Sequence, residues 1–225
     1  NADEFFLGST SGSDANDVSF AGTTGGLSSG EYAGANAGQY LTYGAANETW
    51  MKTLGKDSAK FTMFSVAKRA ATYNGERNGF CGTRAESVAD VGWWFIWNSA
   101  AKLAWGHTDD AGSMTEDIVD TATDGTSIHM VGLSLDEAVG AGGSFFWQDG
   151  AYMQVSSSNT FDGSYSSPAT ADPTRTMNLM ALGNGERQMV SDGRFYVLAI
   201  WQGVALTKGQ LDSIRTEFLT RTGFA

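Results

Sequence analysis

The sequence predicts an all-β fold, a two-sheet antiparallel sandwich that ends in one short helix. Three observations predict it. Short apolar segments recur along the chain with turn signals between them. Glycine is abundant, at 29 of 225 residues, and only 17% of residues are charged. A helical pattern occurs strongly only at the C-terminal end, and many strands with one terminal helix are typical of a sandwich.

The C-terminal part contains the clearest elements. The apolar run 195–201 is rich in aromatic and β-branched residues and predicts a central strand buried on both faces. Thr207 to Gln210 has the pattern of a capping box, which predicts a helix that starts there. Leu206 and Leu211 are placed to form a hydrophobic staple across that start. The apolar face of the helix is predicted to hold Leu211, Ile214, Phe218 and Leu219.

The remaining elements follow from apolar runs bounded by turn residues. Strands are predicted at 40–43, 61–67, 92–97, 102–106, 127–134, 144–147, 151–155 and 177–182, with a helical turn within 47–54. Asp149-Gly150 predicts the tip of a hairpin between 144–147 and 151–155. We predict two regions, a Gly/Ser-rich N-terminal arm or irregular edge at 1–38 and the sandwich domain at 39–225.

Charge and cysteine content exclude several classes of function. The net charge of −11 disfavours nucleic acid and anionic membranes as partners. No run reaches the roughly 18 apolar residues of a membrane helix, and residues 1–4 do not have the pattern of a secretion signal. Cys81 is the single cysteine, so no internal disulfide forms, and its apolar surroundings predict a small buried side chain.

The order of several segments resembles the concanavalin A-like lectin/glucanase superfamily. The segments are Tyr40-Leu41-Thr42, then 61–66, 128–133, 146–150, 179–183 and 192–201, followed by Ala205-Leu206-Thr207 and the helix. The resemblance covers roughly residues 40–223 and is greatest to laminin-G-like domains of the kind found in phage virion proteins. It implies a jelly roll of two curved antiparallel sheets. It does not fix a function, since the superfamily holds enzymes, lectins and structural modules.

No catalytic residues are predicted, and the chain is predicted not to be an enzyme. Glycosidases need two carboxylates on either side of the scissile bond, and the glucanase members carry them as Glu-x-Asp-x-x-Glu on one strand. That run is absent here, and the strands 61–67, 93–97, 145–147 and 195–201 contain no acid. Glu116-Asp117 and Asp136-Glu137 are predicted to be solvated pairs in polar loops.

No metal site is predicted either. The two histidines, His107 and His129, have no spacing that would build a zinc site with Cys81, and His129 is interpreted as structural. The resemblance allows Ca²⁺ at the rim of the sandwich. Its oxygen ligands would come from loop acids, which we interpret instead as solvated: Asp109, Asp110, Asp120 and Asp124.

Aromatic residues supply the candidate binding residues. Alternation along the 92–97 strand places Trp93, Phe95 and Trp97 on one face and Trp94 and Ile96 on the other. One face packs in the core. The other is predicted to be covered by a loop, by a neighbouring subunit or by a sugar stacked on an indole. The candidates for carbohydrate or partner binding are Trp93, Trp94, Trp97 and Trp105.

Three functions compete, and a phage virion surface protein is the main prediction. Such a capsid decoration or tail-associated protein would be non-enzymatic and held among other virion or coat subunits as a homo-oligomer. Phe5, Phe6 and Leu7 are the candidates for an assembly arm. The alternative is an extracellular carbohydrate-binding module, which needs an aromatic side chain open to solvent. The third, a glycan-cleaving enzyme, lacks its carboxylates.

Overall fold

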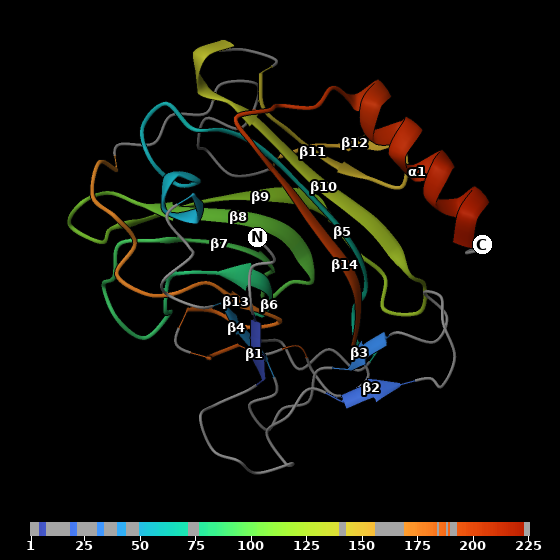
Figure 1. The fold of residues 1–225 in the computed structure, drawn as a ribbon, viewed down its shortest axis with the longest axis horizontal. Helices are drawn as coiled ribbons and strands as arrows, with labels where there is room; N and C mark the ends of the chain where they lie inside the picture. The colour runs from blue at the N-terminus through green and yellow to red at the C-terminus, as the bar shows by residue number, and fades with distance from the viewer. Residues whose placement is uncertain are drawn as a thin grey trace.

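The computed structural model describes residues 5–7, 19–21, 31–33, 40–43, 50–71, 77–139, 143–155, 169–183, 185–187, 189 and 193–222. Within these residues, two antiparallel sheets of seven strands each pack face to face, and one long helix lies outside them (Figure 1). The predicted all-β sandwich with a C-terminal helix is therefore confirmed. No helix in the described ranges is long and apolar enough to span a bilayer.

The first sheet, sheet A, holds the tryptophan-rich strand near its centre. Its order is β1 (Phe5–Leu7), β4 (Leu41–Tyr43), β13 (Asn178–Leu179), β6 (Asn78–Gly82), β7 (Trp93–Trp97), β8 (Lys102–Thr108) and β9 (Met114–Ala122). The hairpin of β7 and β8 was predicted. The strand β9 was not, and the prediction that Glu116 and Asp117 lie in a polar loop is wrong. The cause is that acids interrupt the apolar alternation of β9, with Glu116 beside Trp94 on the outer face and Asp117 buried on the inner face.

The second sheet, sheet B, is built around β5 (Lys60–Lys68). Its order is β12 (Ala151–Met153), β11 (Phe145–Gln148), β10 (His129–Asp136), β5, β14 (Arg194–Gln202), β3 (Glu31–Ala33) and β2 (Ser19–Ala21). The strand β14 was predicted to be buried on both faces, but Val197 to Trp201 are only half-buried. The reason is that β3 pairs only with Arg194 and Phe195, which leaves the rest of β14 with one described neighbour, β5.

The space between the sheets is filled by aromatic and aliphatic side chains. Trp93, Phe95 and Trp97 of β7 point into this core together, as the alternation predicts, and Trp105 of β8 joins them. The rings contact each other closely, with 5.5 Å between the centroids of Trp93 and Trp105. Cys81 is also fully buried here, and burial raises the pKa of its thiol well above the ordinary range, so it stays protonated.

The helix α1 (Lys208–Thr222) covers the outer face of sheet B (Figure 1). Its predicted apolar face, Leu211, Ile214, Phe218 and Leu219, packs with the outward side chains of β5, β10 and β11. The capping box forms as predicted. Thr207 N donates to Gln210 Oε1 at 2.8 Å, and Gln210 N donates to Thr207 Oγ1 at 3.3 Å. The start of α1 is thereby fixed beside the β11–β12 hairpin.

Three other predictions concern a hairpin turn, a helical turn and a strand. The two turns are confirmed, and the strand is shorter than predicted. The β11–β12 hairpin turns at Asp149 and Gly150, whose φ angles are +51° and +99°. The helical turn appears as η3 (Met51–Thr53). The strand predicted at 177–182 is shorter than expected, because the chain leaves the extended conformation at Met180, where φ is +65°. A second short helical turn, η4 (Glu137–Val139), follows β10.

The N-terminal region contributes short strands at the sheet edges. The backbone of Phe5–Leu7 pairs with β4 of the same chain, and β2 and β3 pair with each other at the end of sheet B. The rest of 1–38 and the side chains of Phe5, Phe6 and Leu7 lie outside the described residues. The division at residue 38 and the assembly role of these three residues stay predictions.

Candidate functional site

The four predicted tryptophans do not form a binding surface in this structure. Trp93, Trp97 and Trp105 have no exposed area, and Trp94 is 2% exposed. The first three face the opposite sheet, where their rings are part of the core. Their assignment as surface residues for a sugar or a partner is therefore corrected. An apolar ring this large contributes most to stability when fully buried, and here the sandwich buries it.

Trp94 lies on the other face of sheet A, and the chain itself covers it. The guanidinium groups of Arg77 and Arg84 lie 5.4 and 5.1 Å from the centre of its ring. Its Nε1 donates to Glu116 Oε1 at 3.1 Å. Of the three predicted covers for this face, the structure contains the first, because side chains of the same chain shield the indole. No partner is needed to bury it.

Glutamates hold Arg77 in place, and backbone oxygens of Ala85 and Gly112 accept hydrogen bonds from Arg84. Arg77 pairs with Glu86 and with Glu116, and Arg187 pairs with Glu86. Burial alone would lower the pKa of Arg77, but the charges and hydrogen bonds of Glu116 and Glu86 outweigh it and raise the pKa. Both glutamates are therefore engaged by arginines of the same chain, which favours a structural cover over a binding site for an ion.

The exposed aromatic ring belongs to Tyr152 of β12. It is 58% exposed, more than any other aromatic side chain in the described part of the chain. Tyr152 is the register partner of Trp147 on β11, so both point to the outer face of sheet B. The ring of Phe145 meets the Tyr152 ring edge to face, with 5.0 Å between centroids. This contact fixes one side of the ring and leaves much of it open to solvent.

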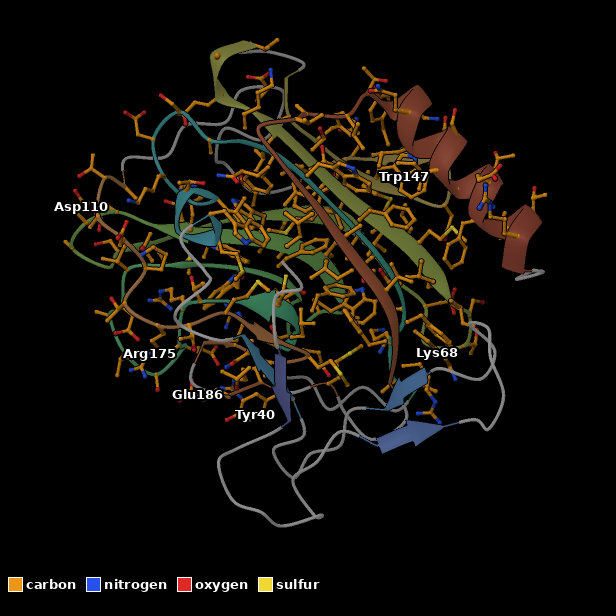
Figure 2. All side chains as sticks on the ribbon, viewed as in Figure 1. Tyr40, Lys68, Asp110, Trp147, Arg175 and Glu186 are labelled. Atoms are coloured by element: carbon orange, nitrogen blue, oxygen red, sulfur yellow. The ribbon has the colours of Figure 1, made fainter. Side chains whose placement is uncertain are left out.

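Two charged side chains of α1 complete this surface. Lys208 Nζ lies 5.9 Å from the centre of the Tyr152 ring and 2.6 Å from Asp212 Oδ2. The other oxygen of Asp212 accepts a hydrogen bond from Trp147 Nε1 at 2.9 Å. Figure 2 shows Trp147 between the β11–β12 hairpin and the start of α1. We call this surface the Tyr152 patch, defined by Phe145, Trp147, Tyr152, Lys208 and Asp212.

The electrostatics of the patch suit binding better than acid–base chemistry. Hydrogen bonds from Lys208 and Trp147 lower the pKa of Asp212, so its carboxylate is ionised and accepts hydrogen bonds. A general acid needs the opposite shift. The nearby carboxylate of Asp149 on the hairpin is occupied by His129 and by Met130 N. The patch therefore offers an aromatic face, a donor and an acceptor, which can hold a hydroxylated ligand reversibly.

A second polar cluster, which we call the His129 clasp, lies beside the hairpin turn. His129 Nδ1 is 2.6 Å from Asp149 Oδ2, and His129 Nε2 is 3.0 Å from Asp124 Oδ2. Asp124 is an ionised acceptor, because hydrogen bonds from Thr126 and Ser127 lower its pKa. Carboxylate oxygens face both ring nitrogens of His129, which favours the imidazolium, the form in which both nitrogens donate.

The four acids considered for calcium do not converge. Asp109 accepts hydrogen bonds from Ala111 N and Ser113 N, while Asp110 accepts from Thr170 N. Asp110 lies at one end of the sandwich and Lys68 at the other (Figure 2). Lys68 follows Ala67, the register partner of His129, and His129 contacts Asp124. Asp110 and Asp124 therefore belong to opposite ends. Within the described ranges, no three His, Cys, Asp or Glu side chains are arranged to hold a metal. The interpretation of these acids as solvated, with calcium allowed only by the resemblance, stays a prediction.

Comparison with known proteins relates this fold to binding domains. No family model matches the sequence, and no curated protein is similar enough to match. The receptor binding domain of botulinum neurotoxin C/D mosaic serotype matches 96% of this chain and 46% of its own, with a TM-score of 0.61 and 10% identity. The botulinum neurotoxin serotype G binding domain matches 98% of this chain and 47% of its own, with a TM-score of 0.59 and 11% identity.

A carbohydrate-binding module has the same fold at nearly its full length. The Ruminococcus gnavus IT-sialidase CBM40, solved with α2,3 sialyllactose, matches 84% of this chain and 99% of its own, with a TM-score of 0.56 and 13% identity. The fold is shared with binding domains. This chain spans about half the length of the toxin binding domains that it matches.

The sequence interpretation missed the residues that the structure brings together. The hairpin that carries Tyr152 was predicted, but Tyr152 was not named as an exposed binding residue. A signal was available, because Lys208 and Asp212 are four residues apart directly after the predicted helix start. Their proximity to Tyr152 depends on how α1 packs across sheet B, which no local pattern specifies.

Proposed function

We propose that this chain is a non-enzymatic, extracellular binding domain of the concanavalin A-like type that holds a saccharide at the Tyr152 patch. The observation that carries the proposal is the exposed Tyr152 ring, fixed beside the Lys208–Asp212 pair. The alternative predicted from sequence required an aromatic ring open to solvent. Tyr152 meets that requirement in place of the buried tryptophans. The fold shared with a carbohydrate-binding module and with receptor binding domains supports the proposal.

The chemistry of the patch favours a neutral saccharide. The apolar face of a pyranose ring packs on an aromatic ring, and adjacent hydroxyl groups then reach polar side chains around it. Lys208 can donate to one hydroxyl and Asp212 can accept from the next, and both hydrogen bonds are charge-assisted. The patch itself has one positive and one negative charge. The net charge of −11 on the whole chain repels polyanionic glycans.

The assembly function has lost one of its supporting arguments. That argument was the apolar second face of β7, which was expected to be covered by a loop of the chain or by a partner. Arg77, Arg84 and Glu116 cover Trp94 within the same chain. We therefore rank binding ahead of assembly. A place on a virion surface among coat subunits stays a prediction.

A glycan array followed by titration calorimetry tests the proposed function. We expect binding to a neutral glycan, and Tyr152→Ala should weaken it at least tenfold, which is about 1.4 kcal/mol. Val204→Ala is the matched control, because Val204 is also exposed, at 43%, and lies outside the patch. No binding across the array, or equal affinity in the parent and Tyr152→Ala, would contradict the proposal.

A further inference from the structure

The turn that presents Tyr152 is held in an unusual backbone conformation. Asp149 has a φ of +51°, in the left-handed region that glycine tolerates better than other residues. Its amide donates to Met130 O at 3.0 Å, and its Oδ1 accepts from Met130 N at 2.9 Å. Gly150 follows with a φ of +99°, and Tyr152 comes two residues later on β12. The orientation of Asp149 therefore helps to determine where Tyr152 lies.

The remaining oxygen of Asp149 is bound by His129. The distance from His129 Nδ1 to Asp149 Oδ2 is 2.6 Å, and His129 itself is only 7% exposed. The opposite ring nitrogen contacts Asp124, whose other oxygen accepts from Thr126 N at 2.7 Å. One imidazolium thus connects the hairpin turn to the loop that leads into β10.

The strand β5 packs beside His129 and carries two positive charges near it. Ala67 is the register partner of His129, and Lys68 and Arg69 follow Ala67 along the chain. Arg69 directs its Nε to Thr123 O, with a donor–acceptor distance of 3.0 Å. This hydrogen bond ties Arg69 to the loop that carries Asp124.

The strand β11 contributes an uncharged neighbour. Gln148 Nε2 lies 3.2 Å from His129 Nδ1, and its amide does not titrate. Burial alone would lower the pKa of His129, but the hydrogen bond and charge of Asp149, followed by those of Asp124, outweigh it and raise the pKa above 6.5. The stability that the His129 clasp gives the folded state is therefore fully present below pH 6.5. It is lost as the pH rises through the raised pKa of His129.

We infer that His129 is a positioning residue for the Tyr152 patch: its imidazolium holds the Asp149–Gly150 turn, and loss of that proton frees the hairpin and weakens ligand binding. This inference rests on the proposed function, because it concerns the site proposed there. It assigns His129 a role through Asp149 and not through contact with the ligand. A saccharide would bind most firmly while His129 keeps this proton, and less firmly as the pH rises through the raised pKa of His129.

Hydrogen exchange tests the inference without a ligand. We would measure exchange of the amides in 145–153 at pH 6 and pH 9, corrected for the intrinsic effect of pH, with nitrogen NMR of the imidazole in parallel. In the parent protein, exchange should rise about tenfold for each unit by which the pKa of His129 is raised. His129→Gln should exchange rapidly at both pH values. Asp124→Asn should show a smaller rise, and Asp120→Asn, which removes an exposed charge outside the clasp, should match the parent.

The second measurement is the affinity of the protein for laminarihexaose and cellohexaose over the same pH range. A loss of affinity that follows the imidazole titration, and that is absent in His129→Gln, supports the inference. An exchange profile that is flat in the parent, or unchanged by His129→Gln, overturns it. Hairpin exchange that rises while affinity stays constant also overturns it. If neither probe binds at any pH while the exchange profile is intact, the proposed function fails and the hold of His129 on the hairpin stands.

Discussion

The indole of Trp94 lies directly over Gly106. A Cβ atom at position 106 would be only 2.2 Å from Trp94 Nε1, so β8 must lack a side chain there. The same nitrogen donates to Glu116 Oε1 on β9. Trp94 therefore reaches from β7 across β8 to β9 on the outer face of sheet A, and it can do so only because Gly106 leaves the path open.

Replacing Gly106 by alanine should destabilise the protein. The new methyl group would displace the indole and break its bond to Glu116, at a cost of about 1–3 kcal/mol for overpacking. Gly209→Ala is the matched control, because its Cβ would meet only Thr207 Oγ1 at 4.0 Å, and alanine favours a helix by about 1 kcal/mol. Urea unfolding should move in opposite directions for the two variants. A neutral Gly106→Ala would show that Trp94 has room to shift.

The loss of unfolding free energy should be largest for substitutions of the most deeply buried side chains and smallest for the helix cap. Leu133→Ala should cost the most, in the upper part of the roughly 2–5 kcal/mol range, because Leu133 is fully buried in the core. Leu198→Ala should fall near the lower end, since Leu198 on β14 is only half-buried. Thr207→Ala should cost about 1 kcal/mol by removing the helix cap. Equal losses for all three in a urea titration would contradict this ranking.

The two histidines should limit stability on opposite sides of pH 6.5. Burial lowers the pKa of His107 from 6.5 to about 4. The unfolded chain then binds the extra proton between these values, so acid destabilises the fold by up to about 3 kcal/mol. The raised pKa of His129 acts in the other direction, and its contribution to stability is lost as the pH rises through that pKa.

Unfolding free energies measured by urea titration from pH 4 to pH 10 check both effects. His107→Gln should flatten the acidic side of the profile and leave the alkaline side as it is. His129→Gln should flatten only the alkaline side. A profile in which either variant changes the opposite side would show that other groups control the pH dependence.

The protein should not hydrolyse glycans. Asp212 is ionised and bound by Lys208 and Trp147, and the patch contains no second carboxylate to act with it. Incubation with β-glucans, alginates and agar should release no reducing ends. Turnover that disappears on Asp212→Asn would overturn this prediction and the proposed function with it.

Local chemistry explains what the sequence could predict. The capping box at Thr207 and the turn at Asp149-Gly150 need only neighbouring residues, so their patterns were sufficient. Alternation also assigned Trp94 and Trp97 to opposite faces of β7. These features are determined within a few residues of the chain.

Tertiary contacts explain what was missed. The strand β9 has acids at Glu116, Asp117 and Asp120, and only its pairing with β8 shows which of them is buried. Asp117 has no exposed area because it is the register partner of Trp105 and shares its inward direction. The Tyr152 patch likewise joins a hairpin and a helix that are distant in sequence, so no single stretch of sequence could reveal it.

The pairing of Val119 with Val155 has a consequence for how this protein behaves at high concentration. The two outermost strands, β9 of sheet A and β12 of sheet B, come together there, and Asp120 N donates to Gln154 O at 2.7 Å. An exposed edge strand offers unpaired amide and carbonyl groups to which a strand from another molecule can add. At this seam each sheet satisfies groups of the other, so the sandwich resists edge-to-edge aggregation along that side. Tyr152 comes just before this seam, so its exposed ring lies close to a closed part of the sheet edge.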